Sequence, residues 1–169
     1  MAKIEEESGV AVRWIPWEGR PDGVPFLEST PEQAKERLAK HRALAAKYDM
    51  TLIFPEMKCR TRQTHQATLF ARAHGLMEAF RNAVYEARFQ EDLDIADRGV
   101  LVALAEKVGL DGKGLNEALD GGTYVAELDA LRQQGKDLGV EGTPTYIVDG
   151  QKFHGVDESD AVLEALKKR

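Results

Sequence analysis

The sequence has almost no cysteine and no long apolar run. Cys59 is the one cysteine in 169 residues. A single thiol cannot form an intrachain disulfide or a Cys-X-X-Cys redox pair, and it excludes a zinc site with two or more cysteine ligands. No run of about 18 apolar residues occurs, and the first residues lack the apolar core of a secretory signal. These absences predict a cytoplasmic protein with no membrane partner.

Positive charge is also in short supply. Lys and Arg together number 23 against 29 Asp and Glu, which gives a formal net charge of -6. Proteins that bind nucleic acid need a basic surface to neutralise phosphates, so no nucleic-acid partner is predicted. The remaining composition, 43% hydrophobic and 31% charged, is typical of a globular chain. The length suits one domain, or one domain with an insertion, around a sizeable core.

The first third of the chain predicts one strand and one long helix. Residues 10–17 place apolar side chains at a period of two, which is typical of a strand. A loop rich in Gly and Pro follows at 18–25. Thr30 begins a capping-box pattern, so a helix is expected over 30–48. Residues 51–55 then predict a short extended stretch that ends at a proline.

Capping residues and glycines predict a run of helices over residues 60–138. Asp97 and Asp111 are placed to cap two of these helices, and glycines follow the ends of several. The expected helices are 60–74, 76–90, 98–108, 112–120 and 123–138. The last part of the chain changes to a β-hairpin with an Asp-Gly turn, followed by a final helix. The expected strands are 145–148 and 151–154, and the expected helix is 158–168.

Three separated segments resemble one known family. Residues 139–150 look like the cis-proline segment of the DsbA family. Residues 14–22 are similar to the loop that follows a strand in the FrnE-like branch of that family, and 89–110 are similar to its helical insertion. Relatives in the same superfamily include 2-hydroxychromene-2-carboxylate isomerase and the kappa-class glutathione transferases. The resemblance implies an α/β, thioredoxin-like fold that carries an all-helical insertion.

The resemblance also implies a division of the chain and a missing part. Residues 1–55 and 125–169 correspond to the thioredoxin-like domain, and 56–124 correspond to the helical insertion. The family opens with a strand, a Cys-X-X-Cys motif and a helix, and this N-terminal βα unit is missing or altered here. Without that strand the sheet has an unpaired edge, which is costly when buried and adhesive when exposed. We therefore expect a second copy of the chain to cover the edge in a homodimer.

The resemblance places a ligand site at Thr143 and Pro144. In relatives a cis proline exposes the backbone of the residue before it, which pairs with an extended peptide or with glutathione. Thr143 and Pro144 are thus predicted to form one wall of a ligand groove. The alternative interpretation is that Pro144 only shapes the entry to the strand.

Two further residues are candidates. Cys59 lies between Lys58 and Arg60 and close to a helix start, an environment that would lower a thiol pKa, so it is a candidate reactive thiol; the alternative is an incidental cysteine. In the glutathione-using relatives an acidic residue near the last helix holds the ligand amine, a role open to Asp157. The alternative for Asp157 is a simple helix cap. The histidines lack metal-ligand spacing, so no metal is predicted, and glutathione is the one cofactor considered.

Three functions follow from these observations. The first is a DsbA-family thiol–disulfide oxidoreductase-like protein that has no redox dithiol of its own and retains a cis-proline ligand groove. The second is a glutathione-dependent transferase or isomerase of the same superfamily. The third is a non-catalytic module that binds a peptide or a protein partner.

Overall fold

The computed structural model describes residues 2–26, 28–54 and 58–168, and the side chains of Ala2, Lys3 and Asp157 lie outside the described part. The chain divides into two compact units. The first combines Met1–Gly19 with Asp129–Arg169, and the second is Arg20–Leu128. The elements in chain order are α1 (Ala2–Ser8), α2 (Pro31–Lys47), α3 (Arg62–Ala73), α4 (Met77–Phe89), α5 (Arg98–Lys107), α6 (Gly112–Asp120), α7 (Val125–Asp137), β1 (Thr145–Val148), β2 (Gln151–His154), the 3-10 turn η1 (Val156–Glu158) and α8 (Ser159–Lys167).

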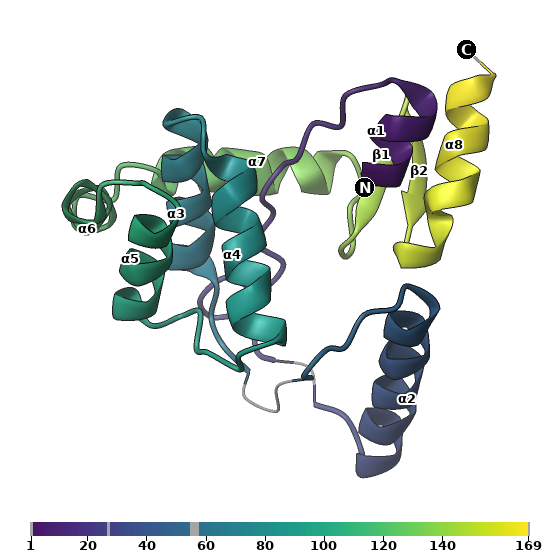
Figure 1. Ribbon diagram of the computed structural model, residues 1–169, viewed down its shortest axis with the longest axis horizontal. Helices are drawn as coiled ribbons and strands as arrows, with labels where there is room; N and C mark the ends of the chain where they lie inside the picture. The colour runs from purple at the N-terminus through teal and green to yellow at the C-terminus, as the bar shows by residue number, and fades with distance from the viewer. Residues whose placement is uncertain (1, 27, 55–57, 169) are drawn as a thin grey trace. The chain divides into compact units, whose positions relative to one another are not determined.

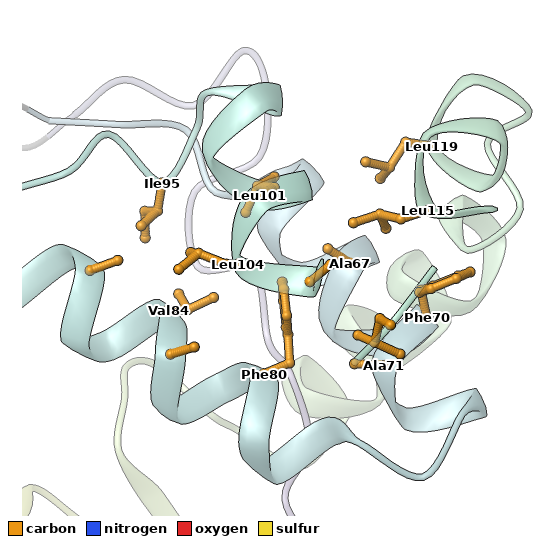
Figure 2. Close-up of a cluster of buried hydrophobic side chains, with 14 residues drawn as sticks. Ala67, Phe70, Ala71, Phe80, Val84, Ile95, Leu101, Leu104, Leu115 and Leu119 are labelled. Atoms are coloured by element: carbon orange, nitrogen blue, oxygen red, sulfur yellow. The ribbon is translucent and has the colours of Figure 1, made fainter. Parts of the chain in front are cut away.

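The second unit is a helical bundle around one apolar core. Helix α3 packs on α4, α5 and α6, and α4 also packs on α5. Phe80 and Leu101 are fully buried at the centre, and Figure 2 shows their side chains directed toward those of the neighbouring helices. Burial of apolar area of this kind supplies the main favourable free energy of folding. The remaining labelled members of the core are Ala67, Phe70, Ala71, Val84, Ile95, Leu104, Leu115 and Leu119.

Local capping chemistry fixes the helix starts that the sequence predicts. The Thr30 side chain accepts from the amide of Gln33, and the Gln33 side chain accepts from the amide of Thr30. Asp97 accepts from the amide of Val100 at the start of α5, and Asp111 accepts from the amide of Lys113 at the start of α6. These side chains satisfy amides that the first turn of a helix leaves without a partner.

The first unit carries the hairpin. Strands β1 and β2 pair in antiparallel register, with Thr145 opposite His154 and Val148 opposite Gln151. One face of the hairpin packs on α8, through Phe153 of β2, and α1 packs against α8 as well. Figure 1 shows α1, the hairpin and α8 together in this unit. Ile4 of α1 is 2% exposed and belongs to the same apolar cluster.

The strand predicted over 10–17 is wrong. These residues form no strand, and the preceding segment, for which no element was expected, is helix α1. The reason lies in their hydrogen bonds, because the amide of Val12 donates to the Glu5 carboxylate at 2.8 Å rather than to a neighbouring strand. Period-two apolar residues need a pairing strand as well as a pattern. Val12 still packs against the apolar cluster of this unit, which accounts for its apolar side chain.

Sheet content is therefore small in the described part of the chain. The sheet consists of β1 and β2 alone, and helices make up most of the rest. The predicted α/β fold is confirmed only in part, because the described residues are mostly helical and form a sheet of two strands. The predicted boundaries of the insertion, 56–124, stay a prediction. None of the described helices combines the length and the apolar character that a membrane crossing requires.

Candidate functional site

Thr143 and Pro144, the predicted site, lie in the loop 139–144, which precedes β1 and is hydrogen-bonded to the hairpin. The Thr143–Pro144 peptide bond is cis, as the sequence predicts. The hydroxyl of Thr145 donates to the carbonyl of Gly142 at 2.7 Å, and Lys152 Nζ donates to the carbonyl of Gly139 at 3.2 Å. These bonds hold both ends of the loop against the strands, so the backbone at its centre has a defined position.

The hydrogen-bond register of the hairpin follows from one contact. The amide of Gly155 donates to the carbonyl of Pro144 at 3.0 Å, just beyond the end of β1. Along an antiparallel pair, opposed residues alternate between pairs that exchange hydrogen bonds and pairs that do not. Pro144 belongs to a hydrogen-bonded pair, so every second residue after it does too. Tyr146 and Val148 therefore exchange hydrogen bonds with β2.

The other residues of β1 present their backbone to the opposite edge. By the same alternation, the N–H and C=O groups of Thr145 and Ile147 point away from β2, and those of Thr143 continue the row. In the described part of the chain no further strand pairs with this edge, and the Thr143 backbone makes no backbone hydrogen bond. Thr143 is exposed. We call this row, Thr143, Thr145 and Ile147, the free edge of β1.

His154 joins the site, although sequence reasoning set it aside. Its Nδ1 lies 3.1 Å from Oγ1 of Thr145. The Thr145 hydroxyl has one hydrogen, which goes to the Gly142 carbonyl, so it must accept from Nδ1–H of His154. In the neutral ring this leaves Nε2 as a hydrogen-bond acceptor. The strand register places the imidazole beside the loop, a contact that no local sequence motif encodes.

Gly142 allows that contact. A β-carbon added at Gly142 would lie 2.8 Å from Cε1 of His154, closer than real β-carbons approach. Lys152 shares the exposed face of β2 with His154, because the two residues are separated by two positions. The loop is therefore flanked by two ionisable side chains of β2, one at Gly139 and one at Gly142.

The structure does not test the role predicted for Asp157, and it places Cys59 in a different unit from the loop. The Asp157 side chain lies outside the described residues, so its predicted role stays a prediction. Cys59 belongs to the other unit, where it packs against the helical core. Burial raises the pKa of the Cys59 thiol; the charge of Arg88 opposes this rise, and the charge of Asp94 adds to it. The fold therefore does not give Cys59 the thiolate-stabilising environment that the flanking Lys58 and Arg60 predict.

No metal centre emerges from the ionisable residues. Within the described ranges, no group of three or more His, Cys, Asp or Glu side chains is placed to hold a metal ion. His65 is instead a structural residue of α3, with Nε2 3.3 Å from Oγ1 of Thr61. Burial lowers the pKa of His65 to about 4, which keeps this ring neutral at physiological pH.

The hairpin, the cis proline and the neighbouring helices define a class of protein. The DSBA-like thioredoxin domain matches residues 1–167, and the chain belongs to this family. It has a single cysteine and no Cys-X-X-Cys motif. The uncharacterized protein YwbO of Bacillus subtilis is 28% identical over 162 residues, which are 93% of this chain and 81% of that protein.

A named enzyme is also among the relatives. The 2-hydroxychromene-2-carboxylate isomerase of Sphingobium xenophagum is 35% identical over 127 residues, or 75% of this chain and 64% of the isomerase. This chain thus spans less than two thirds of that relative.

Two solved structures share the fold. A structure of 2-hydroxychromene-2-carboxylate isomerase superposes with a TM-score of 0.80 and 17% identity, covering 99% of this chain and 85% of that one. A structure of a probable DsbA oxidoreductase from Streptomyces coelicolor superposes with a TM-score of 0.75 and 24% identity. The match covers 83% of this chain and 62% of that one. At these identities the likeness concerns the fold alone, a DsbA-like thioredoxin fold.

Proposed function

We propose that this chain binds the main chain of an extended peptide, or of glutathione, along the free edge of β1, with no dithiol chemistry of its own. The observation that carries the proposal is the exposed Thr143 at the end of that edge. An extended segment can add to such an edge as a further strand, because its own N–H and C=O groups match the spacing of the row.

The flanking side chains supply the remaining recognition. Ile147 is 40% exposed and gives the edge an apolar contact. Lys152 and His154 lie on the exposed face of the hairpin. A cationic Lys152 attracts a ligand carboxylate, and Nε2 of His154 accepts a hydrogen bond from a ligand N–H, O–H or S–H.

The lack of a second thiol separates binding from redox catalysis. Dithiol exchange requires one cysteine to attack a substrate disulfide and a second to resolve the mixed disulfide. Cys59 has no partner of this kind in the sequence. In an insulin-reduction assay with dithiothreitol, we expect the 169-residue chain to leave the rate at that of the reductant alone. A rate above that of the reductant alone would overturn the proposal that the chain has no dithiol chemistry of its own.

A matched pair of substitutions tests the free edge. Ile147→Pro removes one outward amide and leaves the bonds to β2 in place, because proline is tolerated at an edge position whose N–H faces solvent. Ile147→Thr keeps the amide and changes only the side chain. We expect Ile147→Pro to weaken binding of a short peptide or of glutathione by about tenfold or more, and Ile147→Thr to bind within about threefold of wild type.

Unchanged binding by a folded Ile147→Pro variant would contradict the edge as the binding surface. Circular dichroism and the melting temperature report whether that variant is folded. If it is not, nuclear magnetic resonance titration of the wild-type amides replaces it, since that measurement needs no substitution.

A second candidate function is a glutathione-dependent isomerase. Its support is the relative named 2-hydroxychromene-2-carboxylate isomerase, 35% identical over 75% of this chain. Here a proton passes from the glutathione thiol to Nε2 of His154, which leaves a thiolate beside the loop. The test is isomerisation of 2-hydroxychromene-2-carboxylate with and without glutathione. His154→Gln should remove the glutathione-dependent rate, while His41→Gln, on α2, should keep it.

A second copy of the chain is the other occupant that the sequence predicts for the free edge. Sedimentation distinguishes the two occupants, because a homodimer built on this edge becomes a monomer in Ile147→Pro and dissociates as peptide is added. A monomeric wild type that binds peptide supports the peptide as occupant. A wild type that is monomeric and binds no peptide contradicts both.

A further inference from the structure

Helix α2 is strongly basic, although the chain as a whole is acidic. Its 17 residues contain five basic side chains against Glu32 and Glu36, and all five are exposed. Without α2, the totals of 23 basic and 29 acidic residues fall to 18 and 27, so the rest of the chain is more acidic than the whole. Positive charge gathered on one helix favours an acidic partner surface. The five basic residues are Lys35, Arg37, Lys40, Arg42 and Lys47.

The segment that follows α2 covers one side of this helix. The His41 ring stacks on the Phe54 ring with centroids 5.5 Å apart, and the amide of Met50 donates to the carbonyl of Ala45. Ala45 is the one buried residue of α2, all of which lies in the described part of the chain. Packing between helices of the bundle joins α3, α4, α5 and α6, and α2 has no comparable packing on them. The rest of its surface is therefore open.

One open face of α2 combines charge with apolar side chains. Four residues recur at spacings of three and four positions, which places them on the same face of the helix. They are Arg37, Lys40, Leu44 and Lys47. Tyr48 follows on this face; it is 43% exposed, and Nζ of Lys47 lies 5.6 Å from the centre of its ring. We call these five residues the basic face of α2.

An acidic counterpart lies in the same unit, at the end of α4. Residues 85–94 contain four acidic side chains against one basic side chain, the buried Arg88. The net charge of -3 is equal and opposite to the +3 of α2. Two large apolar side chains of this segment are also exposed, Tyr85 at 49% and Leu93 at 37%. The acidic residues are Glu86, Glu91, Asp92 and Asp94, of which the first three are exposed.

One hydrogen bond brings the two surfaces close together within each copy of the chain. The amide of Ile53 donates to the carbonyl of Phe89 at 2.7 Å, so the segment after α2 meets the end of α4. A subunit that carries a basic and an acidic surface can pair with a second copy about a twofold axis. Each α2 then lies on residues 85–94 of the other copy. Both contacts form together, which closes the assembly at two copies.

We propose that the basic face of α2 docks on residues 85–94 of a second copy of this chain, in a twofold dimer. Leu44 and Tyr48 supply the apolar part of the contact. A lipid surface fits this helix less well, because Leu38 and Leu44 are its only apolar residues larger than alanine and proline. The interface is separate from the free edge of β1, so a dimer built on it persists in Ile147→Pro.

Sedimentation velocity of the full chain at two salt concentrations is the first test. We expect a dimer at about 100 μM protein in about 50 mM NaCl, with a dissociation constant at least about tenfold weaker in about 500 mM NaCl, because salt screens the charges. A monomer in the low-salt buffer would overturn the proposal, and so would a dimer that is indifferent to salt. Binding of a monomeric chain to vesicles rich in phosphatidylglycerol would assign the basic face to a membrane instead.

An exchange of charge identifies the two surfaces. Arg37→Glu with Lys47→Glu reverses the basic face, and Glu86→Lys with Glu91→Lys reverses the acidic segment. Each double variant alone should dimerise at least about tenfold more weakly than wild type. An equal mixture, with one partner fluorescently labelled, should form a heterodimer about tenfold tighter than either homodimer, because both contacts regain opposite charges. Folded variants that form no heterodimer would contradict the pairing. If circular dichroism shows a double variant to be unfolded, Arg37→Glu and Glu91→Lys replace the pairs.

The matched control is on another face of the same helix. Lys35 and Arg42 are seven positions apart, so they share a face, which lies on the side of α2 away from Leu44. Lys35→Glu with Arg42→Glu makes the same change in net charge as the reversal of the basic face. We expect this control to dimerise within about threefold of wild type. Equal weakening by both double variants would show that net charge alone governs association, and would overturn the proposal.

Discussion

The hydroxyl of Thr145 lies 3.1 Å from Nδ1 of His154, across the first pair of the hairpin. The same hydroxyl donates to the carbonyl of Gly142 at 2.7 Å, so it can only accept from the imidazole. This short chain of hydrogen bonds connects the loop before the cis proline to the ring on β2. It fixes the tautomer of His154 and directs the accepting nitrogen away from Thr145.

The first prediction concerns that tautomer. In wild type at pH 8, ¹⁵N spectra of His154 should show the Nδ1–H form as the dominant neutral species. Thr145→Val removes the acceptor and should shift the ring toward the Nε2–H form that an unconstrained histidine side chain prefers in water. Thr145→Ser keeps the hydroxyl and is the matched control. A dominant Nε2–H form in wild type would contradict the assignment.

The second prediction concerns Gly135, which is buried in α7. A β-carbon there would lie 2.5 Å from Nε1 of Trp17, whose indole donates to the carbonyl of Arg132 at 3.4 Å. Alanine favours a helix by up to about 1 kcal/mol over glycine, but the clash outweighs this gain. Gly135→Ala should lower the free energy of unfolding by about 1–3 kcal/mol in urea titrations.

Two controls isolate the clash as the cause. Gln134→Ala changes an exposed neighbour in α7 and should stay within about 0.5 kcal/mol of wild type. In a Trp17→Ala background, Gly135→Ala should be close to neutral, because the indole is no longer in the way. A stabilised single Gly135→Ala variant would show that Trp17 does not pack on α7.

The third prediction follows from His65. Burial lowers its pKa to about 4 in the folded protein, against an ordinary value of 6.5. Between these two pH values the unfolded chain binds more protons than the folded chain, so the free energy of unfolding falls as the pH falls. The loss should begin near pH 6.5, be complete near pH 4, and amount to roughly 3 kcal/mol or less.

Urea titrations over that pH range measure the effect. His65→Gln should flatten the pH dependence, because the titrating group is gone. His41 is exposed on α2, and His41→Gln should leave the dependence as in wild type. An unchanged slope in His65→Gln would assign the dependence to other groups.

The fourth prediction concerns Cys59. Because burial raises its thiol pKa, alkylation by iodoacetamide should be slow at neutral pH and should accelerate only above the ordinary thiol pKa. Urea at unfolding concentrations should raise the rate to that of a free cysteine. Rapid alkylation of the folded chain at pH 7 would contradict the packing of Cys59 against the helical core and revive it as a reactive thiol.

The parts of the fold that the sequence predicts are those set by a few consecutive residues. Examples are the capping box at Thr30, the caps at Asp97 and Asp111 and the Asp-Gly turn of the hairpin, because each depends on residues two to four positions apart. The strand expected at 10–17 failed because a strand also needs a partner. Helix α1 has no such local signal; it packs Ile4 into a cluster with Phe153.

The candidate sites show the same division. The cis bond before Pro144 was predictable from a contiguous segment that resembles a family. The role of His154 was not, since it depends on strand register. The position of Arg60 likewise depends on carbonyls about 40 positions earlier in the chain. Neither relationship leaves a pattern in the sequence.

The central claim is that Thr143, Thr145 and Ile147 form a free backbone edge that binds an extended ligand. The most direct test is a titration of ¹⁵N-labelled protein with glutathione and with a short peptide, followed amide by amide. The account predicts that the amides of these three residues shift, while those of Tyr146 and Val148, which bond to β2, shift far less. No shift at about 10 mM ligand, or equal shifts along the whole of β1, would contradict it.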